Sequence, residues 1–165
     1  MRILGLDPGI AIVGYSIVDA IDGVYNLVAS GSIQTDKNQS DAGRLLEISR
    51  DLEQIINEYK PDCAGVEKLY FFKNQKTIIP VAQARGVILM LLEKYSIDAY
   101  EYTPIVVKQT ITGYGRASKN EVAQGVKRMV ETNGNIWPKL DDTVDSIAIA
   151  VCHARNAEIE LRCIS

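Results

Sequence analysis

The first eighteen residues, MRILGLDPGIAIVGYSIV, constrain the fold more than any other stretch, because they are apolar at nearly every position. A strand with one face in water alternates apolar and polar residues, whereas a continuously apolar strand is covered on both faces. The N-terminal segment therefore predicts a buried strand of a sheet that carries helices on both faces.

One ionisable carboxylate, that of Asp7, interrupts this apolar run. A lone buried carboxylate is costly unless it is hydrogen-bonded, paired or bound to a cation. Pro8 and Gly9 indicate a turn directly after it, so we expect the strand to end at Asp7, with its side chain at the rim of the sheet. A plain turn-forming Asp is the simpler interpretation of Asp-Pro-Gly taken alone.

The length of 165 residues suits one domain, residues 1–165, with a core of its own. Apolar runs stop short of the ~20 residues that a membrane helix needs, and the start lacks the features of a signal peptide. The three cysteines, Cys63, Cys152 and Cys163, are odd in number and lack the spacing of a metal site. We therefore expect a cytoplasmic protein with reduced thiols and no membrane contact.

Apolar periodicity predicts three strands joined by hairpins, followed by alternating helices and strands. The expected strands span residues 2–7, 11–19, 24–34, 63–67 and 97–102. The expected helices span about 40–59 and 77–94, begin at Pro104 and at Ser118, and end with one over about 140–156. This order predicts an α/β fold with a mixed five-stranded sheet and helices on both faces.

The helix expected at 77–94, in IIPVAQARGVILMLLEKY, is apolar almost all round. A helix without a polar face must be covered on more than one side. We therefore expect it to bury one flank on the sheet and another on a further surface, such as a second copy of the chain.

Four acidic residues stand at the ends of expected elements. Asp7 ends the first strand, Glu67 ends CAGVE, and Asp142 and Asp145 lie three apart in the first turn of the last helix. If the strands at 2–7 and 63–67 are parallel neighbours, Asp7 and Glu67 leave the sheet at the same edge. Crowded carboxylates repel one another, and hard oxygen ligands suit Mg²⁺ or Mn²⁺, so the pattern predicts a shared metal site.

Ordinary explanations exist for several of these residues. The helix dipole by itself favours acids such as Asp142 and Asp145 in a first turn. Glu67 is harder to explain in that way, because VEKLYFF places it among buried-type residues with no turn residue nearby. His153 follows Asp142 by eleven residues, about 16 Å along a helix axis, which is too far to share an ion. We therefore expect His153 to be packed or solvated.

Cations concentrate in the middle of the chain, although the formal net charge is −3. Residues 68–128 hold ten Lys or Arg against four Asp or Glu, so the protein has a basic and an acidic side. Within this region, KLYFFKNQK interleaves lysines with aromatic residues, a composition that can hold phosphates and stack on an unpaired base. An aromatic core patch with lysines on its rim explains KLYFFKNQK equally well.

A second basic segment, KQTITGYGRASK, places Lys108, Arg116 and Lys119 around glycines whose backbone can approach a phosphate closely. It lacks the spacing of a Walker A motif, so it is not a nucleoside-triphosphate loop. We interpret it as a further candidate phosphate contact.

These segments together resemble the RuvC family of Holliday junction resolvases, which has a ribonuclease H-like fold. The resemblance covers nearly the whole chain: ILGLDPG, VEKLYFFKNQ with QARGV, YTPIVVKQTITGYGRASK and DDTVDSIAIAVCHA. Each segment is modestly specific alone, but four in order at suitable spacing make an accidental match improbable.

The resemblance implies a homodimer that makes two symmetric, metal-dependent cuts in a four-way DNA junction during recombination and repair, leaving 5′-phosphate ends. It makes Asp7, Glu67, Asp142 and Asp145 the catalytic carboxylates, holding two Mg²⁺ or Mn²⁺ ions per site. It also suggests branch-migration helicases as partners. The candidate DNA contacts are Lys108, Lys119, Arg116, Tyr70, Lys73, Lys76 and Arg85.

Tyr70 departs from the family pattern, which usually has Phe at the position that meets bases at the junction centre, although the stacking ring is kept. Two other functions stay open. The chain could be a non-catalytic protein of the same fold that binds junctions, or a nuclease acting on RNA or on other branched DNA. All four matched carboxylates are present, and a pure binding module has no use for negative charge beside phosphates.

Overall fold

The computed structural model describes residues 1–69, 75–134 and 137–164, and gives only the backbone course at 75–77 and 160–164. The strands are β1 (Arg2–Asp7), β2 (Ile12–Ile21), β3 (Val24–Gln34), β4 (Cys63–Glu67), β5 (Asp98–Tyr102) and β6 (Val130–Glu131). The helices are α1 (Asp41–Tyr59), α2 (Gln75–Lys94), α3 (Pro104–Thr112), α4 (Lys119–Met129) and α5 (Asp141–Ile164).

The strands form one mixed sheet in the order β5-β4-β1-β2-β3-β6. β1, β2 and β3 are joined by antiparallel hairpins, while β4 pairs parallel to β1 and β5 parallel to β4. β1 and β4 are parallel neighbours, as expected, so Asp7 and Glu67 lie at the same end of the sheet, where both strands finish.

The predicted count of five strands is wrong, because β6 adds a sixth at the edge, parallel to β3. β6 has only two residues, which is too short for an alternating pattern to be visible in the sequence. The last helix also runs beyond its predicted end near residue 156, to Ile164, since no Gly or Pro follows to stop it.

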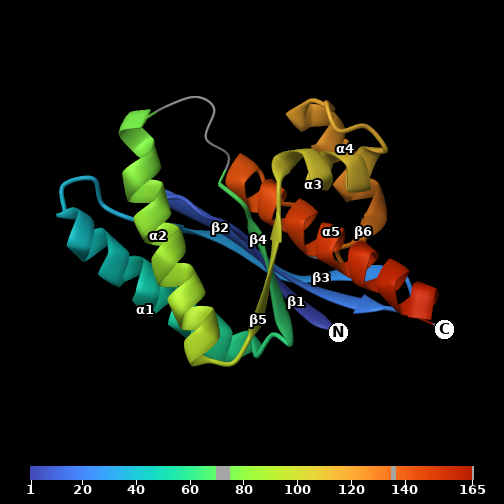
Figure 1. Ribbon diagram of the computed structural model, residues 1–165, viewed down its shortest axis with the longest axis horizontal. Coiled ribbons are helices and arrows are strands. Elements are labelled where there is room, and N and C mark those ends of the chain that lie inside the picture. The colour runs from blue at the N-terminus through green and yellow to red at the C-terminus, as the bar shows by residue number, and fades with distance from the viewer. Residues whose placement is uncertain (70–74, 135–136, 165) are drawn as a thin grey trace.

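Helices cover both faces of the sheet, as predicted (Figure 1). α1 and α2 pack on one face over a core that includes Leu4, Leu6 and Ile17. α5 lies across the other face, with α3 and α4 beside it, over a core that includes Ile3 and Val18. β1 and β2 thus send alternate residues into two cores, which explains their nearly continuous apolar sequence.

Among the described residues, none of the helices combines the length and apolarity needed to cross a bilayer. Cys63 and Cys152 are both buried and carry free thiols.

Candidate active site

α5 approaches the sheet unusually closely because glycines line its path. A Cβ atom added at Gly14 of β2 would collide with the carbonyl oxygen of Asp142, and one added at Gly5 of β1 would collide with that of Ser146. Gly65 of β4 lies in the same way against Ile149. Glycine inside a strand marks such close backbone approach. These contacts bring the first turn of α5 to the carboxyl ends of β1 and β4.

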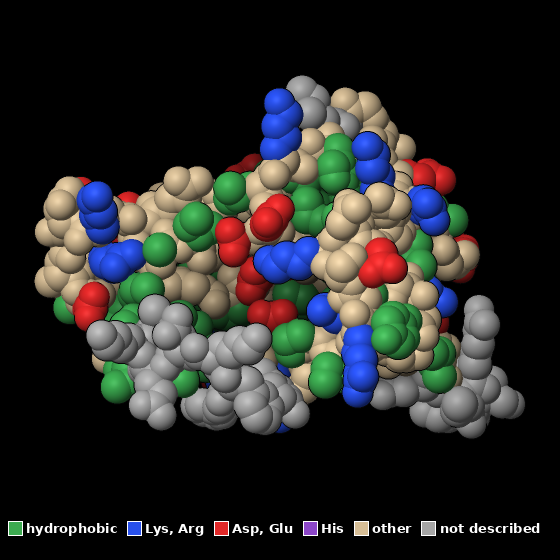
Figure 2. Space-filling view, turned by 90° about the horizontal axis from the view of Figure 1, so that it is seen from above, with side chains coloured by type: hydrophobic (Ala, Val, Ile, Leu, Met, Phe, Trp, Pro, Cys, Tyr) green, Lys and Arg blue, Asp and Glu red, His purple; other side chains and the backbone are tan. Residues whose placement is uncertain are grey.

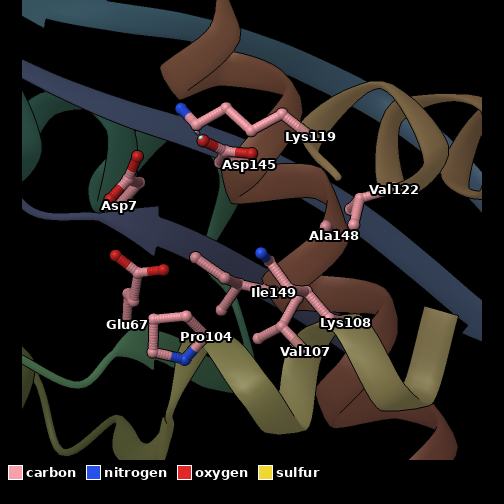
Figure 3. A pocket seen from close by; sticks show the side chains of 10 residues that line it. All are labelled: Asp7, Glu67, Pro104, Val107, Lys108, Lys119, Val122, Asp145, Ala148 and Ile149. Carbon is pink, nitrogen blue, oxygen red and sulfur yellow. Dashed lines mark hydrogen bonds and ion pairs between the residues drawn. The ribbon is translucent and has the colours of Figure 1, made fainter. Parts of the chain in front are cut away.

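Three of the predicted carboxylates line one cavity of about 290 Å³. Figure 3 shows Asp7 from β1, Glu67 from β4 and Asp145 from α5 around a common space. Asp142 is not among the lining residues, but its charge acts on both Asp7 and Glu67. The structure therefore brings three of the four acids that the sequence singled out into one cavity, with Asp142 within electrostatic range of them.

Burial and mutual repulsion raise the pKa values of the acids that line the cavity. Loss of solvent, followed by the charges of Glu67 and Asp145, raises the pKa of Asp7 from its ordinary 3.8 to about 8. Loss of solvent, followed by the charge of Asp145, also raises the pKa of Glu67. Burial raises the pKa of Asp145 too, although neighbouring Lys119 opposes the shift. The pocket thus concentrates more negative charge than its surroundings neutralise.

Two lysines from neighbouring helices complete the wall of the cavity opposite the strands. Lys119 Nζ lies 3.2 Å from Asp145 Oδ2, and that carboxylate raises the pKa of Lys119. Lys108 extends into the cavity from α3 (Figure 3). Local sequence sets both positions: α3 begins at Pro104 behind the cap Thr103, and α4 begins behind Ser118.

The predicted capping box at the start of α4 is confirmed. Ser118 Oγ accepts from the backbone N–H of Glu121, and Glu121 Oε2 accepts from the backbone N–H of Ser118 at 2.7 Å. Lys119 is the first residue of α4, so this cap fixes the backbone from which Lys119 reaches Asp145.

The donor set fits a hard divalent cation. Within the described ranges, no three His, Cys, Asp or Glu side chains already form a group arranged to hold an ion. Mg²⁺, however, typically takes only one or two carboxylates and keeps several waters. Buried acids with raised pKa values are stabilised by an added positive charge, so Asp7, Glu67 and Asp145, with Asp142 beside them, could hold such a cation.

Acidic side chains gather in a hollow on the face where β1 and β4 end, with Lys and Arg side chains across and beside them (Figure 2). This juxtaposition suits a phosphate ester. Cationic side chains can hold the phosphate while the carboxylates hold a cation against it.

The comparisons with known proteins agree with this geometry. The family model described as "Crossover junction endodeoxyribonuclease RuvC" matches residues 3–153. The chain belongs to the RuvC family. Curated family members named crossover junction endodeoxyribonuclease RuvC include those of Halothermothrix orenii, 47% identical over 94% of this chain and 93% of the relative, and Petrotoga mobilis, 46% identical over 93% of each.

Solved structures match over almost the whole RuvC-family chain. The structure titled "T. thermophilus RuvC in complex with Holliday junction substrate" superposes with a TM-score of 0.89 and 26% identity, covering 97% of this chain and 96% of that one. The yeast mitochondrial Holliday junction resolvase Ydc2, at 14% identity and a TM-score of 0.72, covers 96% of this chain and 80% of its own, and shows the shared fold.

The remaining predicted DNA contacts of this RuvC-family chain lie in several places. Arg116 is exposed on the loop between α3 and α4. Arg85 of α2 is ion-paired with Glu101 of β5, and neither residue lines the acidic cavity. The side chain of Lys76, at the start of α2, and the residues Tyr70 and Lys73 lie outside the part of the structure that is described. Their DNA-binding role stays a prediction.

His153 is a packed side chain, as the sequence indicated. It is buried, with Nδ1 2.8 Å from the Tyr102 hydroxyl and its ring stacked on Tyr100 at 4.2 Å between centroids. These residues line a separate cavity with Cys63. Burial raises the pKa of that thiol to about 11, so it stays neutral near pH 7.

Sequence reasoning missed the residues that shape the site without carrying charge. Pro104, Val107 and Val122 form apolar walls of the cavity, and Gly14 admits the first turn of α5. A glycine inside an apolar strand was the available signal for close approach. The sequence did not indicate which helix would approach.

Proposed function

We propose that this RuvC-family chain is a structure-selective endonuclease that resolves four-way Holliday junctions by paired, symmetric, metal-dependent phosphodiester hydrolysis in homologous recombination and DNA repair. The observation that carries the proposal is the cavity in which Asp7, Glu67 and Asp145 face Lys108 and Lys119. The likeness to a RuvC structure in complex with a Holliday junction substrate supports the choice of DNA.

The proposed ligands of two Mg²⁺ or Mn²⁺ ions are Asp7, Glu67, Asp142 and Asp145. These residues would hold the cations, which when bound would lower the pKa of a water for in-line attack and stabilise the charge of the leaving 3′-oxygen, giving 5′-phosphate products. The protein's own contribution is placement. β1 and β4 hold Asp7 and Glu67 at one end of the sheet, and the first turn of α5 carries Asp142 and Asp145 close to that end.

Lys108 and Lys119 hold the scissile phosphate in this proposal. Both side chains line the cavity, and Lys119 already pairs with Asp145. Arg116, Tyr70, Lys73, Lys76 and Arg85 are the further DNA contacts proposed from sequence. Arg85 can contact a phosphate only after exchanging its pairing with Glu101. A chain of net negative charge thus binds DNA through a local basic surface.

The exposed face of α2 supports a homodimer. Ile79 and Met90 are 66% and 53% exposed, and Ala82 and Gly86 lie exposed between them at helical spacing. An apolar stripe centred on small residues suits packing against a second copy of α2, and a two-fold enzyme fits a two-fold junction. Analytical ultracentrifugation of Met90→Lys tests this: the variant should shift toward the monomer.

We also propose that residues 1–165 form a single nuclease domain. A cytoplasmic location is proposed too, because the free thiols of Cys63 and Cys152 suit a reducing compartment. Contact with branch-migration helicases stays a prediction from the family, since no described residue carries it.

Cleavage assays on matched substrates test the function. Purified protein is incubated with labelled four-way junction, linear duplex, single-stranded DNA and a duplex RNA, each with Mg²⁺ or with EDTA. We expect paired nicks in the junction alone, only with Mg²⁺. Binding of the junction without cutting would support the non-catalytic alternative. Preferred cutting of RNA or of another branched DNA would support a different nuclease.

A further inference from the structure

The loop between α3 and α4, residues 113–118, joins two helices that line the acidic cavity. Val107 and Lys108 of α3 line the cavity before this loop, and Lys119 and Val122 of α4 line it after the loop (Figure 3). The loop therefore connects two walls of the cavity.

The backbone of this loop is held firmly on both sides of Tyr114. Gly113 takes the left-handed conformation, with φ of 78°, and its carbonyl accepts from Gln109 Nε2 at 2.8 Å. The N–H of Tyr114 donates to Thr112 Oγ1 at 3.1 Å, and its carbonyl accepts from the N–H of Ala117 at 3.0 Å. The loop is thus ordered before any ligand arrives.

Large apolar side chains of this loop and of the first turn of α3 are exposed to solvent. Tyr114 is 58% exposed, and Ile105 and Val106, in the first turn of α3, are 57% and 40% exposed. Gly115 lies directly against Ile105, so the loop and the first turn of α3 form one patch. We call these three residues, Tyr114, Ile105 and Val106, the rim patch.

Cations lie near the rim patch along the chain. Lys108 follows it on α3, while Arg116 and Lys119 lie beyond Tyr114 along the chain. An aromatic ring beside cations, with its backbone already fixed, is the arrangement by which proteins stack on bases while holding the phosphate backbone. A backbone that is ordered in advance reduces the entropy lost on binding.

We infer that Tyr114 is a base-contacting residue, which stacks on an unpaired or distorted base next to the scissile phosphate, with Ile105 supporting it. This inference rests on the proposed function and deepens it, because it assigns part of the choice of cleavage position to the α3–α4 loop. It is independent of Tyr70, which precedes α2 on another segment of the chain.

Fluorescence of 2-aminopurine tests the contact directly. The probe replaces single bases around the centre of a four-way junction, and Ca²⁺ replaces Mg²⁺ to suppress cutting. Stacking on Tyr114 quenches the probe at one or two positions. Tyr114→Ala should lose that quenching, and Tyr114→Phe, which keeps the ring, should restore it. With Mg²⁺, Tyr114→Ala should cut about tenfold more slowly in single turnover, as expected for the loss of one stacked base.

Two comparisons separate stacking from a general loss of binding. Arg116→Ala should lower the slope of log affinity against log salt by about one, whereas Tyr114→Ala should leave the slope unchanged. Ile21→Ala, at an equally exposed apolar residue at the end of β2, should match the wild-type protein in every assay.

The outcomes distinguish this inference from the proposed function. If the wild-type protein cuts junctions while Tyr114→Ala keeps its quenching, its rate and its cleavage positions, the inference is wrong and the proposed function stands. If Tyr114→Ala instead changes only the sedimentation of the free protein, the rim patch is a protein contact. A wild-type protein that neither binds nor cuts junctions overturns both.

Discussion

Two cavities lie beside α5, and they hold polar groups in opposite ways. In the cavity lined by Cys63, Tyr102 and His153, the Tyr102 hydroxyl is paired with His153 Nδ1 at 2.8 Å. In the acidic cavity, Asp7, Glu67 and Asp145 repel one another, and Lys119 offsets part of this repulsion.

This contrast indicates that the acidic cavity lowers the stability of the folded protein. Buried like charges lower the stability of the folded protein, whereas a satisfied hydrogen bond raises it modestly. The crowded acids therefore become favourable when they bind a cation or a proton.

Asp7→Asn should reduce junction cleavage by more than about 100-fold, because even groups that merely support a metal ligand contribute up to that much. Junction binding, measured by gel shift in Ca²⁺, should be retained, since the lysines remain. Asp98→Asn, at the opposite end of the sheet in β5, is the matched control and should cut normally. Normal cutting by Asp7→Asn under Mg²⁺ would remove Asp7 from the mechanism.

The metal-free protein should lose stability as pH rises from about 4 to 8. The pKa of Asp7 is about 8 in the folded protein, so the folded state keeps a proton that the unfolded state has released, and stability falls by about 1 kcal/mol per pH unit. Urea unfolding in EDTA at a series of pH values measures the slope. Asp7→Asn should flatten it, and an equal slope in both proteins contradicts the assignment.

Gly14→Ala should destabilise the fold by about 3 kcal/mol, because the added methyl group meets the backbone of Asp142 and pushes the start of α5 away. Thermal unfolding measures the loss. The affinity for Mg²⁺, measured by calorimetry at a temperature where the variant is folded, should fall as well. A stable variant with unchanged Mg²⁺ affinity would show that α5 need not lie so close.

Tyr102→Phe should cost only about 1 kcal/mol of stability, the usual contribution of one hydrogen bond. The variant loses the bond to His153 while keeping its ring beside it. Its cleavage rate and Mg²⁺ dependence should match the wild-type protein, because Tyr102 and His153 line the other cavity. A large change in Mg²⁺ dependence would link the two cavities and weaken the comparison.

Much of the site could be predicted from local sequence. Asp7 before Pro-Gly, and Glu67 in an apolar strand, each carry a signal that burial physics can interpret. The capping box at Ser118 was also predicted from the sequence, and it is present. The two-residue strand β6 was not predicted, because it forms only through pairing with β3. Nothing in the sequence singled out Tyr114, whose exposure only the structure shows.

Local sequence was enough to indicate the buried strands, the starts of the helices and the acids at element ends, because these depend on periodicity and on neighbours within a few positions. The meeting of Asp145 with Asp7 and Glu67 could not be read locally, since it depends on β1 pairing with β4 and on α5 lying directly over Gly5 and Gly14. Contacts between distant segments are selected by packing, and packing is a property of the whole fold.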